Sequence, residues 1–169
     1  MAMSKTKVLS APTARPTESA FRELIRTLGL VERVMQPYFA AFGLSGAQWG
    51  VLRNLYRAEE LGLPGLRLTD LSERLLVRPP SVTGLVDRLV RAGLVQRDGS
   101  PLDMRAKQVA LTDKGRELVE RVLAVHGRQI DSVLGVLSPG EQKELHRLLS
   151  VLGHHLEGVL ANGVAANIG

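Results

Sequence analysis

The chain has 169 residues, of which 44% are hydrophobic and 23% charged, with a net charge of +5 and no cysteine. It is long enough to bury a core without disulfides or a structural metal, and the lack of cysteine excludes thiol chemistry and indicates a reducing compartment, so we expect a cytoplasmic protein. No apolar run approaches the ~18 residues that cross a bilayer, which excludes a transmembrane protein.

The first predicted elements are an arm and a long helix. Residues 1–16 contain Pro12 and Pro16 among small polar residues, which predicts a flexible arm. Residues 17–44 are predicted to form a helix that Pro37 kinks or ends near its last turn. The apolar residues that recur there at helical spacing are Phe21, Leu24, Ile25, Leu28, Val31, Val34, Met35 and Tyr38.

Two more helices are predicted before residue 79. Ser45 and Gln48 form the pattern of a capping box, so a second helix begins there. After the helix breaker at residues 62–65, Thr69 is expected to cap a short third helix. The inner faces of these helices are expected to hold Trp49, Leu52, Leu55 and Tyr56 in the second, and Leu71, Leu75 and Leu76 in the third.

A fourth helix and a hairpin follow. Pro79 and Pro80 favour a helix start, because the first turn of a helix needs no backbone N–H from them. Gly93 stands where a left-handed residue ends a helix. Residues 94–97 and 108–111 are typical of two short strands joined by a polar turn. The fourth helix is expected to bury Val82, Leu85, Val86 and Leu89.

The remainder of the chain is predicted to be helical. Thr112 can cap a fifth helix that runs to about Leu137, and Ser138, Pro139 and Glu141 form a second capping box that starts a sixth. The predicted fold class is mainly α with a small β-wing, which is the layout of a winged helix-turn-helix domain flanked by dimerisation helices. The expected parts are the arm, a dimerisation helix in 17–44, the winged domain in 45–111, C-terminal dimerisation helices in 112–161 and a tail in 162–169.

In this layout the fourth helix would lie in the major groove of double-stranded DNA, which admits a helix and presents an unambiguous pattern of donors and acceptors. Arg74 and Arg78 precede this helix and are placed to hold phosphates. Taken alone, residues 80–92 are more typical of an ordinary amphipathic surface helix. The side of the helix left free for DNA carries Ser81, Thr83, Gly84, Asp87, Arg88 and Arg91.

The turn of the hairpin provides a second set of candidates. Arg105 and Lys107 could reach a minor groove, whose negative potential attracts basic side chains, and Asp103 would hold Arg105 extended through a charge-assisted hydrogen bond. A solvated loop with charges of both signs is the alternative. Residues 1–57 hold eight Lys and Arg against three Asp and Glu, residues 61–110 hold eight against five, and residues 111–169 hold six against seven, so the basic excess lies in the first two-thirds of the chain.

Five segments carry a resemblance to a known family. They read QWGVL at 48–52, LTDLS at 68–72, SVTGLVDRL at 81–89, AGLV at 92–95 and LTDKG at 111–115. In this order and spacing they resemble the multiple-antibiotic-resistance regulator (MarR) family, and the flanking helices extend the resemblance over about residues 17–160.

The resemblance implies a homodimeric transcriptional regulator, expected to be a repressor, that binds a pseudo-palindromic operator and is released by a small aromatic or phenolic molecule. Tyr38 and Trp49 are candidates for lining the pocket of that molecule, although aromatic residues of this kind are more often plain core. The Asp–any–Arg wing motif of the family is matched by Asp103 and Arg105. Met104 and Gly84 stand where many members carry arginine, so the chain lacks two of the family's contacts to DNA.

Other classes of function find less support in the residues. The histidines show no metal-binding or acid–base spacing, and the chain has neither a nucleophile elbow nor a glycine-rich phosphate loop, so we expect no enzyme, metal or cofactor. A helical dimeric protein-interaction module without specific DNA binding is the alternative, but it does not explain the basic wing or the prolines at 79–80. The histidines are His126, His146, His154 and His155.

Overall fold

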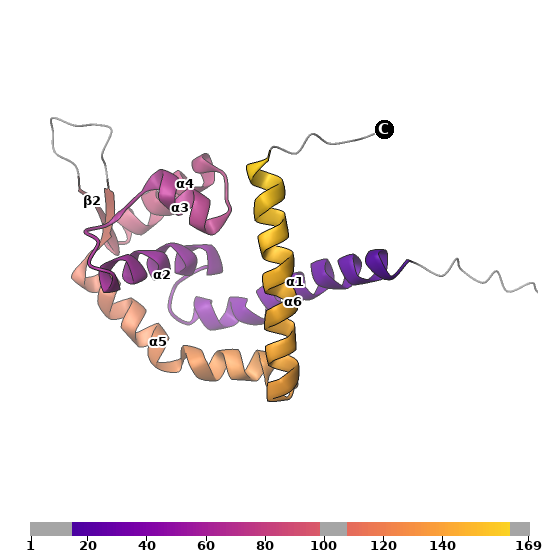
Figure 1. The fold of residues 1–169 in the computed structure, drawn as a ribbon. Helices are drawn as coiled ribbons and strands as arrows, with labels where there is room; N and C mark the ends of the chain where they lie inside the picture. The colour runs from indigo at the N-terminus through magenta and orange to yellow at the C-terminus, as the bar shows by residue number, and fades with distance from the viewer. Residues whose placement is uncertain (1–14, 99–107, 163–169) are drawn as a thin grey trace, which may run out of the picture.

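A computed structural model describes residues 15–98 and 108–162, which form six helices and a small sheet (Figure 1). This is the predicted fold class. Within the described residues no helix is both long and apolar enough to cross a membrane. The elements are α1 (Pro16–Ala40), α2 (Gly46–Glu60), β1 (Leu66–Arg67), α3 (Leu68–Leu75), α4 (Pro79–Arg91), β2 (Val95–Asp98), β3 (Gln108–Leu111), α5 (Asp113–Leu134) and α6 (Pro139–Ala161).

The sheet is antiparallel, with β3 between β1 and β2. Val95 pairs with Leu111 in the predicted hairpin, whose first strand begins one residue later than expected. Strand β1, where Leu66 pairs with Val109, was not predicted, because two residues are too few to show a strand periodicity. The three strands anchor the base of the hairpin to the helical domain.

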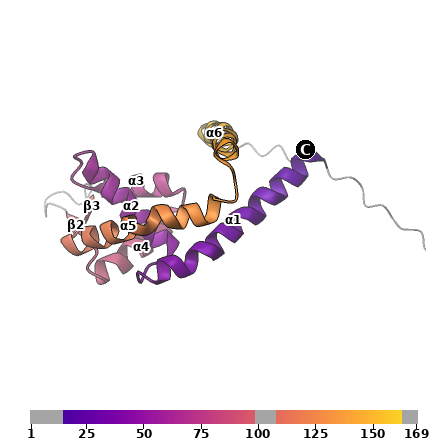
Figure 2. The same ribbon diagram turned by 90° about the horizontal axis from the view of Figure 1, so that it is seen from below.

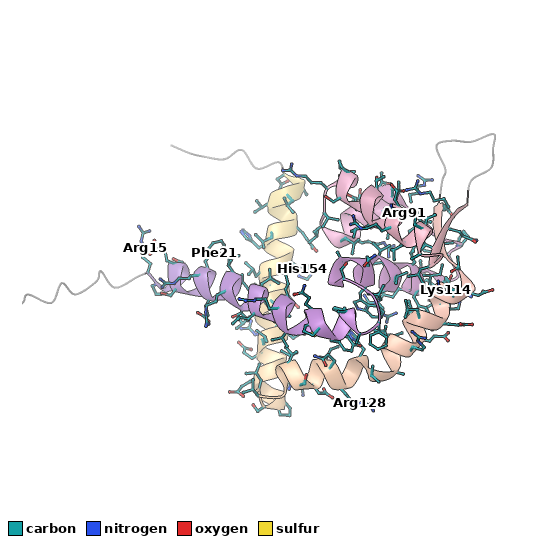
Figure 3. The ribbon with its side chains drawn as sticks, turned by 180° about the vertical axis from the view of Figure 1, so that it is seen from behind. Arg15, Phe21, Arg91, Lys114, Arg128 and His154 are labelled. Carbon is teal, nitrogen blue, oxygen red and sulfur yellow. The ribbon has the colours of Figure 1, made fainter. Side chains whose placement is uncertain are left out.

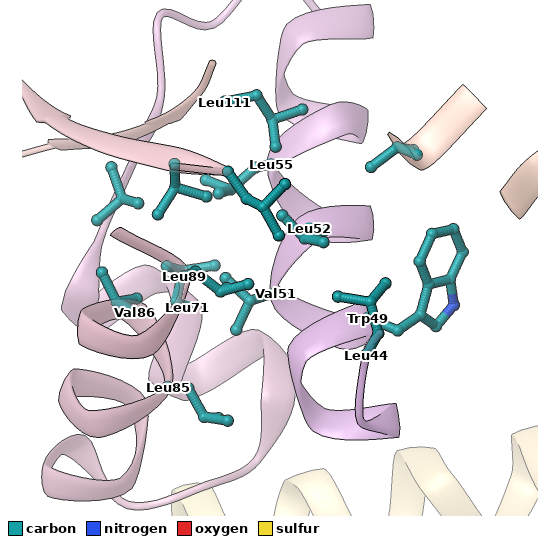
Figure 4. Packing of buried hydrophobic residues seen from close by; sticks show 14 of the residues in the cluster. Leu44, Trp49, Val51, Leu52, Leu55, Leu71, Leu85, Val86, Leu89 and Leu111 are labelled. Carbon is teal, nitrogen blue, oxygen red and sulfur yellow. The ribbon is translucent and has the colours of Figure 1, made fainter. Parts of the chain in front are cut away.

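The core lies between α2, α3, α4, the sheet and the first half of α5 (Figure 4). The predicted inner face of α4 is confirmed, since Val82, Leu85, Val86 and Leu89 are all buried. The same holds for three of the four residues predicted for α2, while the fourth, Tyr56, is partly buried against the core.

Three predicted helix starts are confirmed by their hydrogen bonds. The side chains of Ser45, Thr112 and Ser138 each accept a bond from the backbone N–H three residues later. The prediction that Thr69 caps α3 is wrong. The N-cap is Arg67 and the helix starts at Leu68, two residues earlier than predicted, because the carboxylate of Asp70 accepts a hydrogen bond from the N–H of Arg67 at 3.1 Å.

The prediction that Leu76 faces the core is also wrong. Helix α3 ends at Leu75, and Leu76 adopts a left-handed conformation with φ of 54° that leaves its side chain 83% exposed. Helix α5 likewise ends before the expected Leu137, at Leu134, where Gly135 follows. Pro37 lies in the last turn of α1, as predicted, but α1 ends at Ala40, four residues before the predicted end at 44.

The outer helices leave most of their apolar surface uncovered. Helix α1 buries only Phe39, and α6 buries no residue at all. Figure 2 shows α6 end-on, standing apart from α1 and from α5. Both helices therefore present apolar side chains to solvent in a single chain.

Candidate nucleic-acid interface

The α3–turn–α4 segment is held as one unit. Its turn, residues 76–78, is closed by Ser72, whose hydroxyl donates to the carbonyl of Val77 at 2.6 Å and whose own carbonyl accepts from the Val77 N–H at 3.2 Å. Helix α4 begins with two prolines directly after Arg78. Since four apolar side chains fix the inner face of α4 to the core, its outer face is rigidly presented to solvent.

The described residues predicted to contact DNA lie on or beside this outer face. Arg74 is in the last turn of α3, Arg78 is the N-cap of α4, and both are exposed. Ser81 and Arg88 are also exposed on α4. Three arginines and a short hydroxyl side chain on α3 and α4 are therefore accessible to a partner.

Thr83 and Gly84 are half-buried on the same helix. The Thr83 hydroxyl donates a hydrogen bond to the carbonyl of Pro79 at 3.1 Å, so its oxygen can still accept a bond from a base. A Cβ atom placed on Gly84 would meet nothing within 4 Å. The glycine is thus not required by packing, and it leaves open space on the face that would approach the bases.

Asp87 has a role that the sequence analysis missed. Its carboxylate accepts a hydrogen bond from the guanidinium of Arg97 on β2 at 2.6 Å, and its backbone carbonyl accepts one from Arg91 at 3.3 Å. The pair ties the outer face of α4 to the first strand of the hairpin. Residues ten apart across a turn have no spacing rule, so only the hairpin geometry could have revealed this contact.

The remaining predicted DNA contacts, Asp103, Arg105 and Lys107, lie outside the described residues. The strands that lead to them are described as far as the pair of Asp98 and Gln108. The expected hydrogen bond between Asp103 and Arg105 stays a prediction.

The N-terminus of α5 is bonded to the corner between α4 and β2. The Thr112 hydroxyl donates to the carbonyl of Gly93 at 2.7 Å, and the Lys114 ammonium donates to the carbonyl of Ala92 at 2.9 Å. Gly115 packs so closely on the Leu94 carbonyl that a Cβ atom would collide with it. The DNA-facing helix, the hairpin and α5 therefore meet at one tightly packed corner.

Tyr38 and Trp49 belong to an aromatic cluster that joins α1, α2 and α5. The Tyr38 hydroxyl donates to the carbonyl of Val122 at 3.2 Å and lies 3.2 Å from Nδ1 of His126. The rings of Trp49 and His126 are 5.3 Å apart between centroids, and Trp49 is only 7% exposed. Burial is the main cause that lowers the pKa of His126, and the positive charge of Arg53 lowers it further. Burial raises the pKa of Tyr38. The cluster member His126 was not predicted from the sequence, where the spacing of the histidines indicated no function.

A hollow of about 280 Å³ lies close to this cluster. Phe42, whose ring centroid is 5.6 Å from that of Tyr38, forms part of its wall together with Leu94 and Leu118. Lys114 and Arg121 are among the charged residues that line it. Among the described residues no group of acidic and histidine side chains is arranged to hold a metal ion.

Comparison with known proteins agrees with this arrangement. The sequence model of the MarR family matches residues 42–106. The uncharacterized HTH-type transcriptional regulator YkoM of Bacillus subtilis is 32% identical over 118 residues, covering 70% of this chain and 73% of YkoM. The HTH-type transcriptional repressor YetL of the same organism is 32% identical over 126 residues, covering 75% and 74%.

Two solved structures share the fold. Bordetella bronchiseptica BpsR, from a study of how 6-hydroxynicotinic acid regulates its DNA binding, aligns with a TM-score of 0.72 at 25% identity over 80% of this chain and 98% of that one. A mutant MarR from E. coli in complex with operator DNA aligns with a TM-score of 0.71 at 23% identity, over 82% and 99%. The chain belongs to the MarR family of transcriptional regulators and, like them, is not an enzyme.

Proposed function

We propose that this chain is a cytoplasmic repressor that binds a pseudo-palindromic operator as a homodimer and is released by a small aromatic or phenolic molecule. The observation that carries the proposal is the outer face of α3 and α4, where exposed arginines flank a helix whose inner face is fully buried. The similarity to YetL, which is named a repressor, supports repression over activation.

The contacts to DNA divide by chemistry. Arg74, Arg78 and Arg88 would bind phosphates, because their charges lie at the edges of the face. Ser81, Thr83 and the backbone at Gly84 would approach base edges in the major groove. Asp103, Arg105 and Lys107 would act in the adjacent minor groove as the wing.

Selection of bound duplexes from a random pool, followed by affinity measurements at several salt concentrations, tests this interface. Arg88→Gln should reduce the slope of log affinity against log salt by about 0.9 per phosphate contact in each subunit. Arg128→Gln is the matched control, since Arg128 is exposed on α5 on the opposite side of the molecule from Arg91 of α4 (Figure 3). Equal slopes for both variants would refute the assigned face.

The unpartnered apolar helices support the homodimer. Helix α6 has 23 residues and buries none of them, and an isolated amphipathic helix in water is marginal. Phe21 and Ile25 on α1 are similarly exposed. Packing of α1 and α6 against a second copy would cover both surfaces and present two α4 helices about 34 Å apart, one turn of duplex.

Light scattering on matched variants tests the dimer. Leu152→Asp on α6 should yield monomers, because a charge would be buried in the interface. Leu63→Asp should leave the dimer intact, because Leu63 lies in the loop after α2, although its exposure of 41% resembles the 37% of Leu152. A parent protein that is monomeric at micromolar concentration would contradict the proposal.

The effector would act near the aromatic cluster. Trp49 packs as core, but Tyr38 is half-buried and contacts Phe42, which lines the hollow described above. A ligand in the hollow would therefore touch the cluster through Phe42. Titration of 6-hydroxynicotinic acid, the molecule named for BpsR, into the operator complex tests for release.

The alternative, a helical dimeric interaction module without specific DNA binding, is supported by the same exposed helices. Retention on random duplex DNA at moderate salt separates the two functions. A protein-interaction module would flow through, whereas the arginines of α3 and α4 should retain a DNA-binding protein.

A further inference from the structure

The ion pair of Asp87 and Arg97 stands at the corner between α4 and the hairpin. Asp87 shares a stripe of α4 with Thr83, Gly84 and Arg91, which are three or four residues away and therefore on the same side of the helix. Arg97 lies on β2, in the strand that leads into the wing. The two side chains are 47% and 35% exposed, so the pair is open to solvent and to a bound partner.

A DNA backbone would pass over this corner. If α4 occupies a major groove and the wing the adjacent minor groove, the phosphates that separate the two grooves lie between them. An unpaired arginine there would bind a phosphate whatever the sequence. Asp87 prevents this by occupying the Arg97 guanidinium at 2.6 Å and by adding a negative charge of its own.

We propose that Asp87 is a specificity-determining residue, which withholds Arg97 from the DNA backbone and so limits binding to DNA of unrelated sequence. This inference rests on the proposed DNA-binding function. The base contacts near the start of α4 then supply a larger share of the affinity for the operator.

Binding of the full chain to a random duplex and to the selected operator, each across a salt series, tests the proposal. Asp87→Asn should raise affinity for the random duplex about tenfold across a dimer and steepen its salt slope by about 0.9 per freed arginine. Affinity for the operator should rise by a smaller factor, so that the ratio of the two affinities falls.

Two controls isolate the released arginine. Glu73→Gln removes one negative charge from an exposed side chain of α3 and should change random-duplex affinity by less than about twofold, which measures the effect of net charge alone. The double variant Asp87→Asn with Arg97→Gln should return to within about twofold of the parent, because the freed cation is gone. Thermal melts check that each variant is folded.

The outcomes separate this proposal from the proposed function. If the parent binds DNA in a salt-dependent way but Asp87→Asn gains no more affinity for the random duplex than Glu73→Gln does, the role of Asp87 is refuted and the proposed DNA-binding function is not. A gain that survives in the double variant refutes it too, since the gain would then come from the lost carboxylate and not from Arg97. Absence of salt-dependent binding by the parent to any duplex refutes both proposals.

Discussion

Leu76 allows a sharp test of the turn before α4. It is the only residue other than glycine with a positive φ among the described residues, at φ 54° and ψ 35°. An L-residue in this region is disfavoured by about 1–2 kcal/mol relative to glycine, because its Cβ approaches the following carbonyl. Its side chain is 83% exposed, so its removal costs little buried surface.

Leu76→Gly should therefore stabilise the protein. The relief of strain is offset by the larger conformational entropy of glycine in the unfolded chain, about 0.5–1 kcal/mol, which leaves a net gain of roughly 0.5–1 kcal/mol. For a chain of this size that gain raises the Tm by about 1–4 °C. Urea denaturation and thermal melts at fixed protein concentration measure both quantities.

Leu61 is a matched control for this substitution. It occupies the same place after α2 as Leu76 does after α3 and is 73% exposed, but its φ is −90°. Leu61→Gly relieves no strain and should destabilise by about 0.5–1 kcal/mol. If both substitutions lower the free energy of unfolding equally, the strain argument for the turn is wrong.

Four further outcomes are expected. Gly84→Ala should stabilise α4 by about 0.5–1 kcal/mol in urea denaturation, since its Cβ meets open space, and Gly84→Arg should raise operator affinity in the salt series. Gly115→Ala should lower the free energy of unfolding by more than about 2 kcal/mol, because its Cβ collides with the Leu94 carbonyl. A variant that melts at the same temperature as the parent would contradict this packing. Because the pKa of His126 is lowered in the folded state, the unfolded chain binds a proton at this residue at a higher pH than the folded chain does. The contribution of neutral His126 to the free energy of unfolding is therefore fully present above the ordinary pKa of 6.5 and is lost as the pH falls from there through the folded-state pKa. His126→Gln should remove that part of the pH dependence in melts between about pH 5 and 8.

Most of the fold could be predicted because its signals are local. The capping residues Ser45, Thr112 and Ser138 and the apolar face of α4 all depend on residues within four positions of each other, and the structure confirms them. The two errors at α3 have separate causes. Its start is set by the hydrogen bond between Asp70 and Arg67 at the end of β1, a strand too short to predict. Its end is set by Leu76, which adopts a left-handed conformation that is expected of glycine and not of leucine.

The candidate site was only partly predictable for a similar reason. The exposure of the arginines at 74, 78 and 88 follows from helix position, and the structure shows all three exposed. The pair of Asp87 and Arg97 and the bonds from α5 to the α4–β2 corner join residues that the hairpin brings together. Sequence periodicity describes single elements, so it carries no information on such contacts between elements.

Helix α5 offers a physical route between the two halves of the proposed mechanism. Its first turn is bonded to the corner that holds α4 and β2, through Thr112 and Lys114, and its middle is bonded to α1 through Val122 and Tyr38. Its last turn leads directly to α6. A helix transmits displacement along its axis because its backbone hydrogen bonds resist bending. A change in how α1 and α6 pack in the proposed homodimer can therefore reach the α4–β2 corner through α5, beside the route through α2, on which α1 also packs. We accordingly expect a ligand that wedges apart the joint between α1 and α5 to change the spacing of the two α4 helices without touching either of them.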